Sequence, residues 1–142
     1  MLVDANILLF AVNESAPEHD RAAAWLQDAL NGSRRVGLPW ESLTAFLRLA
    51  TNPRVVPRPL APADAWEIVE AWLAAPAAWI PVPTERHAAV LGDLMRRHRP
   101  AAKLVPDAHL AALAIEHGAE IISADTDFAR FTEARWRDPL AG

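Results

Sequence analysis

Four acidic residues stand at positions along the chain from which they could share one site. Asp4 follows a short apolar run of β-type residues, and Asp125 follows another β-type segment at residues 120–123. Glu41 and Asp107 each open a segment with the periodicity of a helix. Because the ligand crevice of an open α/β sheet lies outside the carboxyl ends of its parallel strands, all four carboxylates can reach one edge of the sheet.

Taken singly, each acid has an ordinary explanation as a helix cap, a turn former or a partner of the helix dipole. Gathered in one place they behave differently, because two unit charges about 4 Å apart repel by roughly 4 kcal/mol at a dielectric constant near 20. Such a cluster needs either raised pKa values or bound cations. The joint placement therefore predicts a cation site.

The side chains available as ligands indicate which cation this would be. The chain has no cysteine, and none of its five histidines is paired with these acids at ligand spacing, so we expect no histidine ligand. A set of oxygen ligands favours Mg²⁺ or Mn²⁺ over Zn²⁺, and Asn6 could orient the first of them. Divalent ions held in this way activate a water and stabilise the leaving oxygen of an in-line displacement. The reaction class implied is phosphodiester hydrolysis.

The elements that must position these acids alternate along the chain. Strands are predicted at residues 1–3, 35–38, 79–82, 120–123 and 134–136, and residues 7–10 resume the apolar run of the first strand. Helices are predicted at residues 17–31, 40–50, 63–75, from 84 to the basic run before Pro100, and at 106–117, with a short turn or helix at 128–131. Strands that alternate with helices in this way indicate βαβ units. We expect an α/β fold, a three-layer α/β/α sandwich around a mainly parallel sheet.

The totals favour one domain over residues 1–142, a length that can bury a substantial core. The absence of cysteine agrees with a reducing cytosol, and no basic leader or unbroken apolar run of membrane length is present. We therefore expect a cytoplasmic protein that does not enter the membrane.

Cations are distributed unevenly in a chain whose formal net charge is -4. Arg48 shares a polar helix stripe with Glu41 and Thr44, and a basic run ends the helix before Pro100. The residues that could bind RNA phosphates are Arg48, Arg96, Arg97, Arg99 and Lys103. A solvated helix end that complements the helix dipole explains the basic run equally well.

Four blocks of the sequence resemble, in order and spacing, the acidic blocks of the PIN-domain family, and in particular the ribonuclease toxins of VapBC toxin–antitoxin pairs. These blocks are LVDANILLFAV, WESLTAFLRLATNPRV, PDAHLAALAIEHGAEII and SADTDFARF, and the resemblance extends over essentially the whole chain. The resemblance implies a Mg²⁺- or Mn²⁺-dependent endoribonuclease with a PIN-like fold. It further implies inhibition by a cognate VapB-type antitoxin and assembly as a homodimer.

Carried over position by position, the resemblance assigns the acidic quartet to Asp4, Glu41, Asp107 and Asp125, as metal-binding and catalytic residues. Asp127 matches a further acid often present in the family, and Asn6 and Ser123 match polar supporting positions. Many members have threonine where this chain has Ser123, and both residues offer a hydroxyl group.

Two other functions remain open from the sequence. A phosphomonoesterase could use Asp4 as a covalent nucleophile, although that chemistry usually needs a second acid two residues later, where this chain has Asn6. Alternatively, the chain could be a catalytically inactive PIN-like module that binds RNA or protein through the basic run.

Overall fold

The computed structural model describes residues 1–142 and contains one five-stranded sheet. Its strands are β1 (Leu2–Val3), β2 (Val36–Gly37), β3 (Ala78–Trp79), β4 (Glu120–Ile122) and β5 (Arg135–Arg137). Their order in the sheet is β3-β2-β1-β4-β5, and every neighbouring pair is parallel. The predicted parallel sheet is confirmed, and β1 and β4, which precede Asp4 and Asp125, are direct neighbours.

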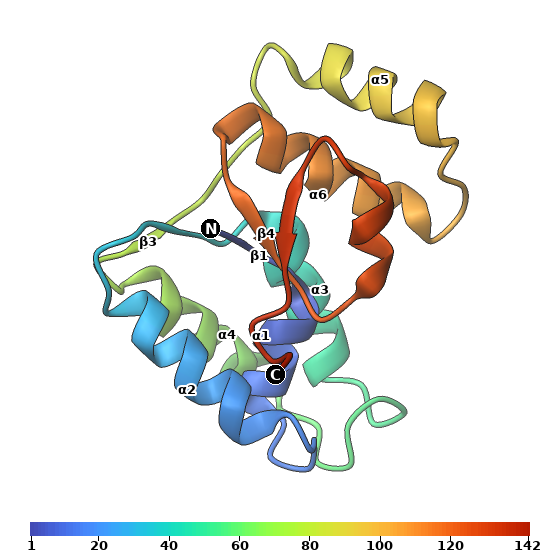
Figure 1. The fold of residues 1–142 in the computed structure, drawn as a ribbon. Helices are drawn as coiled ribbons and strands as arrows, with labels where there is room; N and C mark the ends of the chain where they lie inside the picture. The colour runs from blue at the N-terminus through green and yellow to red at the C-terminus, as the bar shows by residue number, and fades with distance from the viewer.

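Helices cover both faces of this sheet (Figure 1). They are α1 (Ala5–Val12), α2 (His19–Leu30), α3 (Trp40–Ala50), α4 (Pro62–Leu73), α5 (His87–His98) and α6 (Leu104–His117), with a 3-10 helix, η1, at Thr126–Arg130. Because side chains alternate across a strand, Leu2 and Val3 enter two different hydrophobic clusters, as do Ile121 and Ile122. The three-layer α/β/α sandwich is thereby confirmed.

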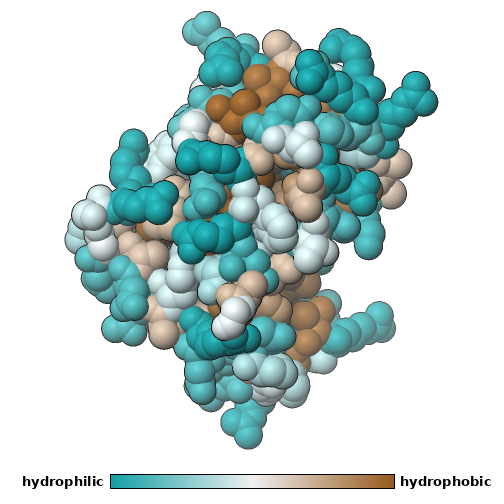
Figure 2. All heavy atoms as spheres, viewed as in Figure 1, coloured by the Kyte–Doolittle hydropathy of each residue, from teal (hydrophilic) through white to brown (hydrophobic).

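The larger cluster joins the sheet to α1, α2, α3 and α4, and it includes Phe46, whose ring meets that of Trp72 edge to face at 4.8 Å. The smaller cluster lies on the opposite face and is built mainly from α6, which contributes six of its eleven buried residues and packs against α5. The face of the molecule drawn in Figure 2 is mostly hydrophilic, with hydrophobic side chains exposed in small areas. None of the helices is both long enough and apolar enough to cross a membrane.

One helix was assigned wrongly from the sequence. Residues 7–10, read as a return of the apolar run, belong to α1, which begins directly after Asp4. A short apolar run does not distinguish a buried strand from a buried helix, and Ile7 and Leu8 are both fully buried. Helix α6 also begins at Leu104 rather than at Pro106, so the proline lies within its first turn, where its missing N–H costs no helical hydrogen bond.

Gly37 provides a test of the close approach between β1 and β2. A Cβ atom added to Gly37 would lie 2.9 Å from the carbonyl oxygen of Met1, whereas one added to Gly92, on α5, would meet only the flexible end of Arg96 at 3.5 Å or more. We expect Gly37→Ala to lower the free energy of unfolding by about 1–3 kcal/mol, since the backbone of β1 must shift. Gly92→Ala should raise it by roughly 0.5–1 kcal/mol through helix propensity. Urea denaturation measures both changes, and equal effects would contradict this packing.

Candidate active site

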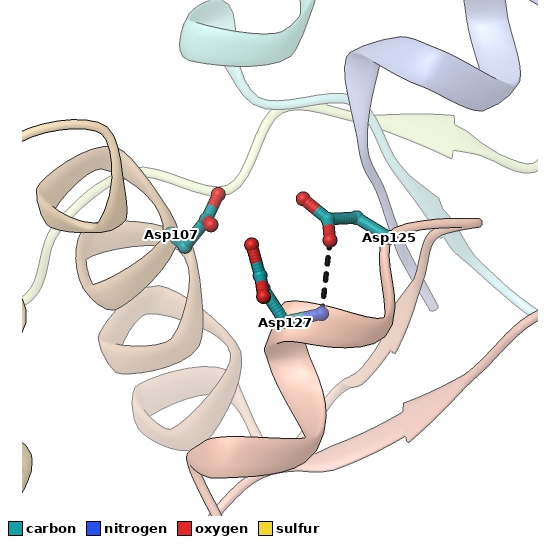
Figure 3. Close-up of side chains that lie close together, drawn as sticks. All are labelled: Asp107, Asp125 and Asp127. Carbon is teal, nitrogen blue, oxygen red and sulfur yellow. Dashed lines mark hydrogen bonds between the residues drawn. The ribbon is translucent and has the colours of Figure 1, made fainter.

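Three carboxylates gather beyond the carboxyl end of β4. One oxygen of each of Asp107, Asp125 and Asp127 lies within 4.8 Å of the others, and the three side chains point toward one another (Figure 3). Asp107 is in the first turn of α6, while Asp125 caps η1 by accepting a hydrogen bond from the N–H of Asp127 at 2.9 Å. Asp107 is therefore carried by a different element from Asp125 and Asp127. We call the three residues the acidic triad.

Asp4 is tied to the same edge of the sheet through Ser123. Asp4 caps α1 by accepting the N–H of Ala5 at 2.8 Å, and its other oxygen accepts the Ser123 hydroxyl at 2.8 Å. The Ser123 oxygen, which is fully buried, accepts hydrogen bonds from Asn6 Nδ2 at 3.1 Å and from the N–H of Asp125 at 3.0 Å. One hydroxyl thus links the ends of β1 and β4 and fixes the backbone that carries Asp125.

Burial and neighbouring negative charges disfavour the ionised forms of Asp107 and Asp4. Burial, followed by the negative charges of Asp125, Asp4 and Asp127, raises the pKa of Asp107 to about 6. Burial also raises the pKa of Asp4, although hydrogen bonds from Ser123 and from the backbone oppose the rise. Arg130 lies 3.6 Å from Asp127, both side chains are partly exposed to solvent, and a single guanidinium does not balance the charge of several carboxylates.

The donor set fits a divalent cation with a preference for oxygen. Only carboxylates make up the acidic triad, and the raised pKa of Asp107 shows that its charged form lacks sufficient compensation. A bound Mg²⁺ or Mn²⁺ would supply that compensation and would accept several such oxygens. The residues present therefore fit the kind of ion expected from the sequence.

Glu41 is the member of the predicted quartet that has no contact or charge coupling to the acidic triad or to Asp4. It is in the first turn of α3, and its Oε1 lies 3.3 Å from Nε2 of His109, a residue of α6. Contact with His109 lowers the pKa of Glu41, against the opposing effect of burial. This contact of His109 could not be predicted, because no sequence pattern links a residue on α3 to one on α6.

The predicted RNA-binding cations lie at helix ends. Arg48 is in the last turn of α3, and Arg96 and Arg97 are in the last turn of α5. Arg97 contacts Asp93 at 3.1 Å and Glu133 at 3.8 Å, so part of its charge is already paired. Arg99 ends α5 in a left-handed conformation, and Lys103 precedes α6. Their role in RNA binding stays a prediction.

An acidic cluster at the carboxyl edge of a parallel α/β/α sandwich agrees with the family to which the sequence points. The family model described as PIN domain matches residues 1–134. The chain belongs to the PIN-domain family.

Curated relatives match this chain over nearly its whole length. Ribonuclease VapC37 of Mycobacterium tuberculosis is 49% identical over 140 residues, which make up 99% of this chain and 97% of the relative. VapC ribonuclease Mb2897 of Mycobacterium bovis is 42% identical over 142 residues, 100% of this chain and 97% of the relative.

Solved structures show the same fold at low sequence identity. VapBC2 from Rickettsia felis, bound to a DNA fragment from its promoter, matches with a TM-score of 0.69 at 14% identity, covering 96% of each chain. VapBC-1 from nontypeable Haemophilus influenzae matches with a TM-score of 0.68 at 16% identity, covering 99% of this chain and 98% of that one.

The raised pKa of Asp107 predicts a pH-dependent cost to stability. In the absence of divalent ions, the folded state binds more protons than the unfolded state between the ordinary carboxyl pKa of 3.8 and about 6, so stability falls as pH rises through this window. Asp107→Asn removes the charge and should stabilise the protein at pH 7 by about 1 kcal/mol, less than the full shift implies because solvent screens the charges.

Chemical denaturation at pH 3.5 and pH 7 in a chelating buffer measures this difference. The gain from Asp107→Asn should shrink below pH 4, where the wild-type carboxyl group is protonated in both states. An equal gain at the two pH values would contradict the electrostatic origin of the effect.

Proposed function

We propose that this protein is a metal-dependent endoribonuclease that hydrolyses RNA phosphodiester bonds and acts as the toxin of a VapBC-type toxin–antitoxin pair. The observation that carries the proposal is the acidic triad, Asp107, Asp125 and Asp127, beside Asp4 at the edge of the sheet. Relatives named ribonuclease VapC, at 38–49% identity over nearly the full length, support the activity.

In this proposal Asp4, Asp107 and Asp125 bind Mg²⁺, with Mn²⁺ as a substitute, and Glu41 completes the catalytic quartet. The ion supplies a water of lowered pKa and compensates the charge of the phosphate. Asp127 contributes a further acidic oxygen at the same place. Ser123 and Asn6 act as supports, since their hydrogen bonds set the positions of Asp4 and of the segment that follows β4.

The proposed partners are a VapB-type antitoxin, the RNA substrate and a second copy of the chain. The similar structures are of VapBC assemblies, and one of them is bound to promoter DNA, which supports pairing with an antitoxin. Cleavage of RNA under the control of an antitoxin implies action in the cytoplasm.

A catalytically inactive module that binds RNA or protein is disfavoured. Such a module has no need to keep several carboxylates close together at a cost in stability, and here burial and mutual repulsion raise the pKa of Asp107 to about 6. The retained acidic cluster therefore favours the enzyme over the binding module.

Removal of one carboxylate charge from the acidic triad should abolish cleavage. We expect Asp107→Asn and Asp125→Asn each to lower the rate of cleavage of a fluorescent RNA by about 100-fold or more, because each change removes an oxygen charge that binds the ion. Asp64→Asn changes an exposed acid on α4 and provides the matched control with wild-type activity. Full activity in folded triad variants would exclude the proposed site.

Chelation should stop the reaction reversibly. With EDTA in excess, we expect cleavage to fall to background, and added Mg²⁺ or Mn²⁺ should restore it because both ions prefer oxygen ligands. Gel analysis of the RNA products measures this, with thermal unfolding as a check that the protein stays folded. Cleavage that persists in EDTA would show that the reaction does not require a divalent ion.

A further inference from the structure

A chain of hydrogen bonds begins at a carboxylate buried beneath α5. The Glu116 side chain, on α6, has no exposed surface, and its Oε1 accepts both the N–H and the hydroxyl of Thr84, at 2.8 and 2.7 Å. Its Oε2 accepts a hydrogen bond from Nδ1 of His87, the first residue of α5. Burial alone would raise the pKa of Glu116, but the bonds from His87 and Thr84 lower it overall. This carboxylate is therefore a fixed anchor for the His87 ring.

The chain continues through a second imidazole toward the candidate active site. His87 Nε2 and His109 Nδ1 form a hydrogen bond of 3.0 Å, with the two rings nearly perpendicular at 75°. The other nitrogen of His109, Nε2, lies 3.3 Å from Oε1 of Glu41. This last contact is within the distance of an ion pair, and Nε2 forms no hydrogen bond within the protein.

The position of His109 connects two parts of the candidate active site. It lies on α6 two residues after Asp107, while Glu41 lies on α3. His109 is the residue with which the Glu41 carboxylate makes an ionic contact, and it is the first cause of the lowered pKa of Glu41. The anchored ring thus links the Glu41 carboxylate on α3 to α6, the element that carries Asp107.

We propose that His109 is a positioning residue for Glu41, and that Glu116 and His87 hold the His109 ring in the orientation that presents Nε2 to the Glu41 carboxylate. The hydrogen bond at one ring nitrogen of a histidine fixes which way the other nitrogen points. This inference rests on the proposed function, because it assigns Glu41 a place in the cleavage reaction. It adds three residues, Glu116, His87 and His109, that the acidic quartet does not include.

Substitutions of His109 test this role by separating turnover from substrate binding. His109→Leu keeps the volume but removes both ring nitrogens, whereas His109→Gln keeps an amide donor that can reach Glu41. We expect His109→Leu to lower kcat by roughly 10–100-fold, because loss of a group that orients a reacting carboxylate usually has an effect of this size. The KM for a short single-stranded RNA should change by less than about twofold. His109→Gln should recover most of kcat. His19→Leu breaks a comparable hydrogen bond, to the Phe10 carbonyl, and should leave both constants unchanged.

The positioning role would be overturned if His109→Leu kept the wild-type kcat, or if it changed only KM. It would also be overturned if the leucine and glutamine variants lost kcat equally. Asp107→Asn in the same assay tests the proposed function separately, since its full activity would remove the nuclease assignment whatever His109 does. A crystal structure of His109→Leu gives a readout that does not depend on activity. We expect the Glu41 carboxylate to leave its wild-type position in that structure, and an unmoved carboxylate would also overturn the inference.

Discussion

Repulsion between like charges is the constraint on which the rest of this structure depends. The acidic triad and Asp4 are held together where burial, and after it the charges of Asp125, Asp4 and Asp127, raises the pKa of Asp107 to about 6. Side chains free to rotate would separate, so the fold must keep them together against this repulsion. It does so with a parallel sheet whose adjacent strands β1 and β4 end at the same edge, and with the buried helix α6, which directs Asp107 toward that edge.

Hydrogen bonds then fix the positions of Asp4 and of the segment after β4, which the pairing of the strands alone does not determine. Ser123 uses its donor on Asp4 and accepts from Asn6 and from the backbone of Asp125, so its hydroxyl has no remaining bond to offer. Asn6 in turn accepts the N–H of Ala124, which closes the link between the start of α1 and the end of β4. The carboxylates are thereby oriented before any ion or substrate binds, as electrostatic catalysis requires.

Much of this arrangement follows from the sequence, because the periodicity of the strands and long helices is a local property. The predicted limits of α3, 40–50, agree with the structure, and all five strands overlap their predicted segments, although β3 ends three residues before its predicted end. The helix at Ala5–Val12 was missed because a short apolar run fits either a strand or a helix once it is fully buried. The contact between Glu41 and His109, and that between His87 and Glu116, depend on how α3, α5 and α6 pack, which no local pattern encodes.

The pairing of β1 with β4 has a consequence for the nascent chain on the ribosome. The Ser123 hydroxyl bonds to a carboxylate 119 positions earlier in the sequence, so the two parts of the site meet only after β4 and Ser123 have left the exit tunnel. Earlier translation intermediates contain Asp4 and Glu41 but lack the partner strand and Asp125. Translation of a protein with this topology must therefore proceed past Asp125 before the acidic site can assemble.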